Sequence, residues 1–352
     1  VRIRILLCLA LILWAGAADA MEYEGFGPFT TRNQNPVYLQ TLSLTPMRAT
    51  TLPEGVMEAR IDSAYSSVFD EDAKSGNVLD MQMEIWRLAP HIDYGLTDDF
   101  EIGLEVPLLH FSGGFLGSFI QKFHKAFGFP NAGRDLYPGD RFSYRFAAGG
   151  ANLMNFPPAT FGLGDIVISA KHQITGEDDN WPAISVFADL KFPTGRKSRG
   201  FGNGSPDLGV GGALDASWKR LHGYFNVGYF VTGGNDLISS YMQNEMLAYM
   251  IAGEVSIIPT LALIVQLNGS TPLLAHSGME QWDGVPLDLI IGFRGEEPDM
   301  IPKSDFIWQV GFAEDVTSRG PSVDFTAFIS VGVRFDIFGR SKPVGDWIAK
   351  KP

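Results

Sequence analysis

The chain has 352 residues and a formal net charge of −13, and 45% of its residues are hydrophobic. So acidic a chain is a poor nucleic-acid binder, because contact with phosphate needs a surplus of Lys and Arg. Its one cysteine is Cys8. The remainder of the chain can therefore form no disulfide, which argues against a small disulfide-stapled secreted domain.

Residues 1–20 have the three parts of a secretory signal peptide: a positive start, an apolar run and a small-residue exit. Arg2 and Arg4 open the segment, and Ala18-Asp19-Ala20 fits a cleavage site. The apolar run is shorter than the ~20 residues of a membrane-spanning helix, so we expect cleavage near Ala20 rather than an anchor. Loss of two arginines and one aspartate changes the net charge from −13 to −14.

Residues 21–54 are irregular and rich in Thr, Pro and Asn, whereas residues 55–338 alternate with period two almost throughout. The alternation predicts twelve strands. They span about 56–69, 78–92, 99–111, 162–174, 182–193, 206–219, 222–232, 245–258, 260–271, 284–294, 305–315 and 322–337.

The outward faces of these strands indicate a membrane environment. The last strand has a continuous apolar face from Phe325 to Ile337, with Phe328 the one apolar exception on its polar face. Such a stripe exceeds the usual globular strand of ~5–6 residues and matches a tilted membrane strand of ~10. The apolar segment 246–267 contains Glu254 and Pro259, which a membrane helix tolerates poorly, so it is read as a hairpin.

The predicted connections alternate in length, which is typical of bacterial outer-membrane barrels. Long connections are 70–77, 112–161, 194–205, 233–244, 272–283 and 316–321; short ones are 96–99, 175–180, 220–222 and 258–260. The connection 295–304 is longer than its class predicts. The expected fold is all-β: a single antiparallel up-and-down transmembrane β-barrel of about 12 strands, with aromatic residues such as Trp86 near strand ends. A soluble β-sandwich is the alternative.

The long connection 112–161 contains Phe115, Phe119, Phe123 and Phe127 at intervals of four residues. This spacing predicts an amphipathic helix in an extracellular loop. The helix would be a lid that packs on the barrel rim, or an apolar mouth that receives hydrophobic ligands.

Charged residues on the polar strand faces should point into the barrel, because they are costly against lipid. The predicted pore-lining residues are Glu84, Glu101, Glu105, Asp189, Lys191, Asp207, Glu254, Asp288, Arg294 and Arg334. Their excess of acids favours cations in an open pore. The alternative is that they form ion pairs that fill a structural barrel.

Catalytic and cofactor motifs are absent from the sequence, so we expect no enzyme and no cofactor. Glu101 and Glu105 lie ~13 Å apart on one strand, too far for a glycosidase pair. The six histidines show no metal-ligand spacing, so no metal site is predicted. A membrane-embedded hydrolase stays open, because the members of such triads have no fixed spacing.

Four stretches resemble a family of proteobacterial outer-membrane proteins catalogued only as a domain of unknown function. They are "FHKAFGFPNAGRD" (123–135), "GLGDIVISAK" (162–171), "FADLKFPTG" (187–195) and "GFAEDV" (311–316). "SVGVRFDI" is similar to the strand signal read by the outer-membrane assembly machinery, with Ser330, Gly332, Phe335 and Ile337 in the matching places. Outer-membrane barrels commonly stop at that last aromatic residue, whereas this chain continues. The resemblance implies a location and a fold, and assigns no chemistry.

The sequence thus predicts a signal peptide (1–20), an irregular segment that is a plug or a periplasmic arm (21–54), a transmembrane barrel (55–338) and a periplasmic tail (339–352). The expected location is the outer membrane of a Gram-negative bacterium, with lipid, lipopolysaccharide and the assembly machinery as partners. The leading functional hypothesis is a passive channel or transporter for small solutes with an acidic, cation-favouring lumen. The alternatives are a plugged scaffold barrel acting through loops or periplasmic partners, and an embedded hydrolase.

Overall fold

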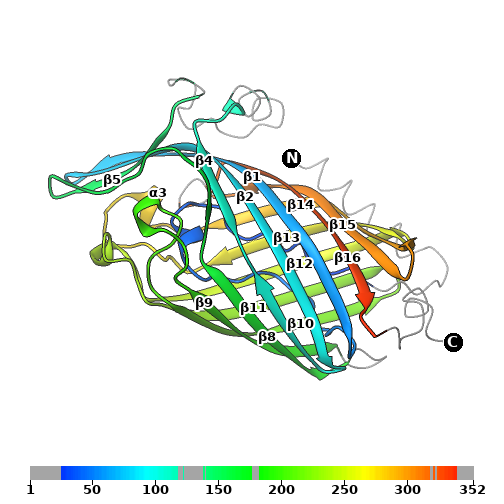
Figure 1. Cartoon of the computed structure of the whole chain (residues 1–352). Coiled ribbons are helices and arrows are strands. Elements are labelled where there is room, and N and C mark those ends of the chain that lie inside the picture. Colours follow the sequence, from blue (N-terminus) through cyan, green and yellow to red (C-terminus); the bar gives the residue numbers. More distant parts are fainter. Residues whose placement is uncertain are drawn as a thin grey trace.

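The protein was analysed as a computed structural model, which describes residues 25–117, 122, 138, 140–176, 182–317, 320, 321 and 323–338. Its strands close into one antiparallel barrel, because β1 pairs with both β2 and β16 (Figure 1). The strands are β1 (Val56–Lys74), β2 (Asn77–Thr97), β3 (Phe100–Glu105), β4 (Leu108–Ser112), β5 (Ser143–Ala148), β6 (Ala151–Asn155), β7 (Ala159–Leu163), β8 (Ile166–Thr175), β9 (Ala183–Phe192), β10 (Asp207–Trp218), β11 (Leu221–Thr232), β12 (Glu245–Ile258), β13 (Leu261–Ser270), β14 (Leu287–Ile301), β15 (Ser304–Asp315) and β16 (Phe325–Asp336).

The barrel wall has twelve strands, which confirms the predicted fold class. β3 and β4 are two halves of one wall strand, as are β7 and β8, and the β5–β6 hairpin extends beyond the wall. The first break falls at Pro107, which has no N–H to give to a neighbouring strand. The second break lies directly opposite, where the Gly164 N–H donates to the Pro107 carbonyl over 2.8 Å.

Two predicted connections are shorter than expected, because the strands beside them are longer. β1 and β2 continue to a turn at Ser75 and Gly76, so the predicted link 70–77 is mostly strand. β14 continues to Ile301 and β15 begins at Ser304, which leaves a turn of two residues in place of the predicted link 295–304. These strand ends have polar residues on both faces, so their alternation is hidden in the sequence.

The two ends of the barrel differ in their connections. One end, called the turn end, has the turns 98–99, 219–220, 259–260 and 302–303, and both ends of the described chain lie near it. The other, called the loop end, has the longer connections 193–206, 233–244 and 271–286, with η3 (Lys197–Arg199), η4 (Ser239–Tyr241) and α3 (Glu280–Asp283). The longer connections therefore gather at the loop end, where the two-residue turn 75–76 between β1 and β2 is an exception.

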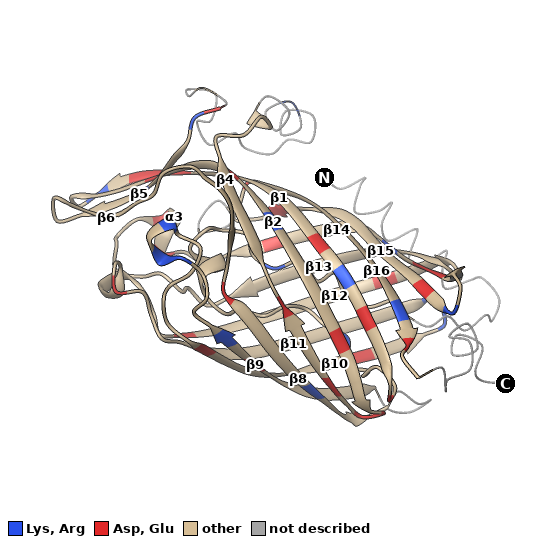
Figure 2. Ribbon diagram, in the orientation of Figure 1, with Lys and Arg blue, Asp and Glu red and all other residues tan. Residues whose placement is uncertain are grey.

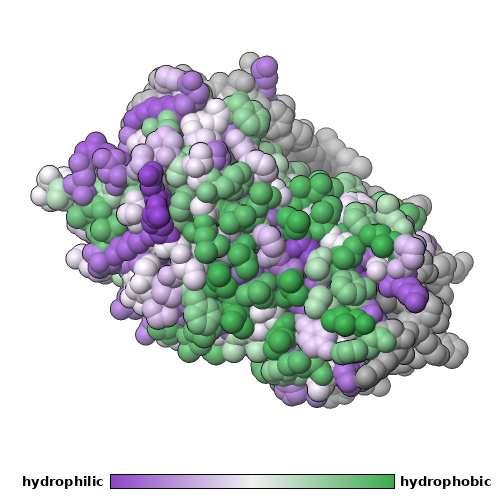
Figure 3. Space-filling view, viewed as in Figure 1, coloured by the Kyte–Doolittle hydropathy of each residue, from purple (hydrophilic) through white to green (hydrophobic). Residues whose placement is uncertain are grey.

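The outer face of the wall is apolar across its middle (Figure 3). Outward-facing aliphatic and aromatic side chains remain exposed on strands all round the barrel, among them Ile61, Leu104, Ile168, Leu190, Val210, Phe225, Ile251, Val265, Phe293, Val310 and Ile329. An exposed apolar band of this extent on a closed barrel matches the lipid-facing surface of a membrane barrel. Among the described helices, none has the length and apolar character to cross a bilayer.

Residues 25–54, called the luminal segment, run through the interior of the barrel. The segment lies at the turn end beside β12, where Phe26 contacts Glu254, and it reaches the loop end at η1 (Tyr38–Gln40). There the Tyr38 hydroxyl accepts a hydrogen bond of 3.0 Å from the Leu273 N–H. The segment returns past β10 to the turn end, where β1 begins. Most of its side chains are buried.

An apolar core closes the loop end. Phe29 of the luminal segment packs edge-to-face on Phe328, with ring centroids 5.0 Å apart. Phe328 is the inward-facing apolar exception on the last strand, and this contact explains it. In the same core the Phe146 ring of β5 stacks on the Trp282 ring of α3, with ring centroids 4.4 Å apart. The folded-in loops therefore cover this end of the lumen.

Candidate functional site in the barrel lumen

Polar side chains of the wall hold the backbone of the luminal segment. An irregular backbone inside a barrel has no ladder of its own, so each buried N–H needs a partner from elsewhere. Eight amide donors find one on inward-facing side chains of β3, β8 and β10 to β13: Phe26 and Gly27 on Glu254, Phe29 on Gln266, Leu42 on Asp207, Met47 on Asn226, Ala49 on Asp215, Thr51 on Gln173 and Leu52 on Glu101.

A buried charge cluster fastens the segment near the loop end. The Lys191 ammonium is 2% exposed and lies 2.8 Å from Asp165 and 3.1 Å from Asp207. It also donates to the Gln40 carbonyl over 2.8 Å and to Asn203 over 2.6 Å. One lysine thus joins the wall, the break between β7 and β8, and the luminal segment.

The bend of the luminal segment is held by Arg32. Its guanidinium donates to the Tyr38 carbonyl over 2.9 Å and to the Thr41 carbonyl over 2.5 Å. Burial, and next the charge of Arg87, lowers the pKa of Arg32 to about 10, so the group remains a cation at neutral pH. The two legs of the segment are therefore joined through one cation.

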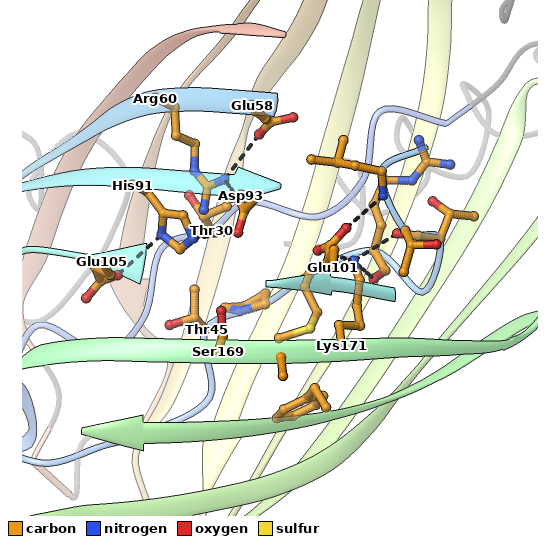
Figure 4. Close-up of a pocket in the computed structure, with 18 of the residues that line it drawn as sticks. Thr30, Thr45, Glu58, Arg60, His91, Asp93, Glu101, Glu105, Ser169 and Lys171 are labelled. Atoms are coloured by element: carbon orange, nitrogen blue, oxygen red, sulfur yellow. Dashed lines mark hydrogen bonds and ion pairs between the residues drawn. The ribbon is translucent and has the colours of Figure 1, made fainter. Parts of the chain in front are cut away.

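A cavity of about 470 Å³ remains near the turn end, between the luminal segment and the wall formed by β1, β2, β3 and β8 (Figure 4). Its volume lies within the range of ~300–1,000 Å³ that is usual for small-molecule sites. Its charged lining consists of the acids Glu58, Asp93, Glu101, Glu105 and Asp189 and the bases Arg48, Arg60, Lys171, Arg294 and Arg334, together with His91. Acids and fixed bases are therefore balanced in number, so the cavity has no net acidic lining.

Most of these charges are paired with one another. Arg60 lies 3.1 Å from Glu58 and 2.8 Å from Asp93 (Figure 4). Arg334 of the neighbouring β16 lies 2.9 Å from Glu58. Figure 2 shows Lys and Arg positions close to Asp and Glu positions along the strands of the wall. The Lys171 ammonium lies 2.8 Å from Glu101. Pairing of this kind is what permits charged groups in a confined lumen.

Glu105 and His91 form a second pair of contacts beside the first network. The Glu105 carboxylate lies 2.5 Å from the Arg87 guanidinium and 3.9 Å from His91 Nδ1. The other ring nitrogen of His91 lies 2.9 Å from Asp93. Glu101 and Glu105 are therefore each occupied by a cation, and neither faces the other as an acid–base pair.

Nine of the ten predicted pore-lining residues lie on inward faces, and the structure divides them into groups. Glu101, Glu105, Asp189, Arg294 and Arg334 line the turn-end cavity. Lys191, Asp207 and Glu254 bind the luminal segment directly. Asp288 also faces the lumen, from β14.

Glu84 is the exception, because it lies on the outer face of β2. Glu84 shares that face with Trp86, because side chains two residues apart on a strand point the same way, whereas His91 and Asp93 of β2 line the cavity. The carboxylate is only 2% exposed because residues 113–116 cover it. It accepts hydrogen bonds from the Phe115 N–H over 2.9 Å, the Leu116 N–H over 2.5 Å and the Tyr65 hydroxyl over 2.7 Å.

The predicted loop lid lies mostly outside the described residues. Phe119, Phe123 and Phe127 are not described, whereas Phe115 is exposed and its ring lies 5.5 Å from Tyr65 on the outer side of the wall. Of the predicted assembly signal, Ser330, Gly332 and Phe335 belong to β16 and Ile337 follows it. Residues 1–24 and 339–352 are not described.

A Ser, a His and an Asp converge beside the cavity without assembling a hydrolytic site. Ser169, His91 and Asp93 surround Gly103, but within the described chain the Ser169 hydroxyl makes no hydrogen bond to His91. Without that bond the hydroxyl lacks a general base. Among the residues that the structure describes, no three His, Cys, Asp or Glu side chains are grouped to hold a metal ion.

Sequence reasoning missed the uncharged partners of the luminal segment. Gln266 both accepts from the Phe29 N–H and donates to its carbonyl, and Asn226 does the same for Met47. An inward-facing amide on an otherwise apolar strand is the signal that could have identified them, since an amide can satisfy an N–H and a C=O together.

Comparison with known proteins places the chain in a family. The family described as "Protein of unknown function (DUF3187)" matches residues 3–335. The chain belongs to this family. A comparison with curated protein sequences finds no match.

Three solved structures are similar to this DUF3187 protein to different degrees. An outer membrane channel from Pseudomonas putida F1 has a TM-score of 0.52 and 14% sequence identity, covering 83% of this chain and 100% of the channel. The NanC porin has a TM-score of 0.40 and 9% identity over 80% of this chain and 100% of the porin. The toluene transporter TodX of Pseudomonas putida has 0.35 and 9% over 89% and 98%. The first similarity shows a shared barrel fold, and the other two are too low to carry an argument.

Proposed function

We propose that this protein is an outer-membrane barrel that passes small solutes passively, and that the luminal segment closes it at rest. The observation that carries the proposal is the arrangement of the lumen: a polar cavity at the turn end, separated from the loop end by the luminal segment and the apolar core that packs on it. A channel that opens and closes in this way needs both a polar cavity and a segment that can leave the lumen. The fold shared with an outer membrane channel supports this class of function.

The proposal assigns the two ends to two compartments. The turn end faces the periplasm and the loop end faces outward, because outer-membrane barrels have short periplasmic turns and longer external loops. Solute would then pass between the loop-end core and the turn-end cavity when the luminal segment moves. The sequence predicted an acidic lumen that favours cations. The cavity lining has as many fixed bases as acids, so we do not extend that preference to the cavity as a whole.

Conductance in a planar bilayer tests the stopper. The full mature chain should give little steady current, and deletion of residues 25–54 should raise it, because the segment leaves the lumen and the loop-end core loses the side chains that the segment contributes. A barrel that conducts equally with and without the segment contradicts the proposal. Heat-dependent gel mobility should confirm that the deletion variant is still a folded barrel.

A reversible lock tests whether the segment moves. The Thr30 hydroxyl of the luminal segment donates to Asp62 of the wall over 3.2 Å. Because both side chains are short, cysteines at these two positions would lie close together. The double variant Thr30→Cys/Asp62→Cys should form a disulfide that abolishes solute uptake by liposomes, with recovery after reduction. The single variants are the control, and the only cysteine of the natural chain lies in the predicted signal peptide.

A second candidate is the plugged scaffold barrel. It is favoured by the number of distinct side chains that hold the luminal segment, from Glu254 near one end to Asp207 near the other. A scaffold and a channel both conduct after deletion of residues 25–54. Uptake that is the same in locked and reduced protein would favour the scaffold.

A further inference from the structure

Asp189 differs from the other carboxylates that line the turn-end cavity. It projects from β9, it is 4% exposed, and the cavity is the space that it faces. Within the described chain its carboxylate accepts no hydrogen bond and forms no ion pair, whereas Glu58, Asp93, Glu101 and Glu105 each have a cation as partner.

Lys171 of β8 is already paired with Glu101, and the residues paired directly with Asp189 on the neighbouring strands are uncharged. These register partners are Ser169 on β8 and Gly209 on β10. Glu105 is close enough to repel it electrostatically, with weaker attraction from His91 and Arg32.

The nearby cations are already engaged elsewhere. Lys191, two residues along β9, contacts Asp165 and Asp207. Arg32 donates to carbonyls of the luminal segment, and His91 contacts Asp93.

A buried carboxylate without a partner is costly, and the cost is removed when an opposite charge binds beside it. The cavity supplies the room for that charge. Gly103, in the same cross-strand row as Ser169 and Asp189, adds no side chain to the wall there. Since the other acids are paired, the cavity is suited to one positive charge rather than several.

We infer that Asp189 binds the cationic group, an ammonium or a guanidinium, of a small organic solute held in the turn-end cavity. The inference rests on the proposed function, since it names the solute class of the same lumen. It places the specificity in one unpaired carboxylate instead of a general acidic field.

Cysteine labelling beside Asp189 tests this without any need for conduction. Ser169→Cys places a single thiol in the mature chain next to the carboxylate. Its labelling rates are measured with a cationic trimethylammonium-ethyl methanethiosulfonate and with neutral methyl methanethiosulfonate. Adding Asp189→Asn should lower the cationic-to-neutral rate ratio by ~10-fold, because the attracting charge is gone.

Glu101→Gln is the matched control, because it removes the same charge from the same cavity at a carboxylate that already has a partner. It should change the ratio by less than about twofold. A ratio unchanged by Asp189→Asn, or lowered equally by Glu101→Gln, overturns the inference. Thr45 of the luminal segment also lines the cavity. Thr45→Cys is the second reporter if Ser169→Cys shows no heat-dependent gel shift and is therefore not a folded barrel.

Protection by a small amine tests binding itself. Butylammonium should slow the labelling of Ser169→Cys by the neutral reagent, butanol at equal concentration should not, and Asp189→Asn should abolish the protection. Protection that is absent, or equal for the amine and the alcohol, also overturns the inference. Failure of the bilayer experiment would leave these labelling results unaffected, so the two proposals fail separately.

Discussion

The loop end and the turn end of the lumen are built from the same strands and differ in what those strands turn inward. On β16 the inward residue near the loop end is Phe328, and the one near the turn end is Arg334. The loop end is consequently a packed apolar core around Phe29, and the turn end is a charged wall around a cavity. One alternating strand can thus contribute to an apolar core at one end and to a charged cavity wall at the other, because each inward position can carry a different type of side chain.

The difference also determines how each end should respond to substitution. A packed core loses contacts that cannot be replaced, whereas water can enter a cavity and replace a lost polar contact. Substitutions at the loop end should therefore cost more stability than matched substitutions at the turn end.

The largest effect is expected at Lys191, the most deeply buried cation of the loop-end half. Lys191→Met leaves Asp165 and Asp207 as uncompensated buried charges, which should lower the free energy of unfolding by about 4 kcal/mol. The measurement is a urea titration in detergent followed by gel mobility. Lys171→Met, beside the cavity, is the control and should cost clearly less; equal losses would contradict the distinction between the two ends.

The next effect is expected at Phe29, which is fully buried against Phe328. Phe29→Ala should cost about 3 kcal/mol and raise the frequency of open events in a bilayer, since it removes the apolar contact that seats the segment. Thr30→Ala, the adjacent residue, loses only its hydrogen bonds to Asp62 and Gln309 and should cost about 1 kcal/mol. If Thr30→Ala opens the barrel as often as Phe29→Ala, the seal does not lie at the apolar core.

The smallest effect is expected at Glu101. In Glu101→Gln the amide oxygen can still accept the Leu52 N–H, and only the attraction to Lys171 is lost. The pair faces a cavity that water can enter, so the change in the free energy of unfolding should be below ~1 kcal/mol. A larger loss in the same urea titration would mean that the turn end is as tightly packed as the loop end.

The sequence by itself determined the barrel. Strand number and the inward and outward faces follow from period two, which is a local property of each strand. The same reasoning placed Glu101, Asp189 and Arg334 on the polar faces of their strands, and in the structure these three residues line the turn-end cavity. It failed at Glu84, where a loop covers an outward carboxylate, because burial by a distant segment leaves no mark on the alternation.

Only the tertiary structure decided what the inward residues do. Residues 25–54 have no periodicity, so nothing local shows that they enter the lumen. The backbone N–H groups of this segment donate to Glu254, Asp207 and Glu101. The sequence had predicted these three carboxylates as the lining of an open pore. Which carboxylate of the turn-end cavity is left without a partner in the described chain depends on the three-dimensional pairing of the others, and that pairing leaves Asp189.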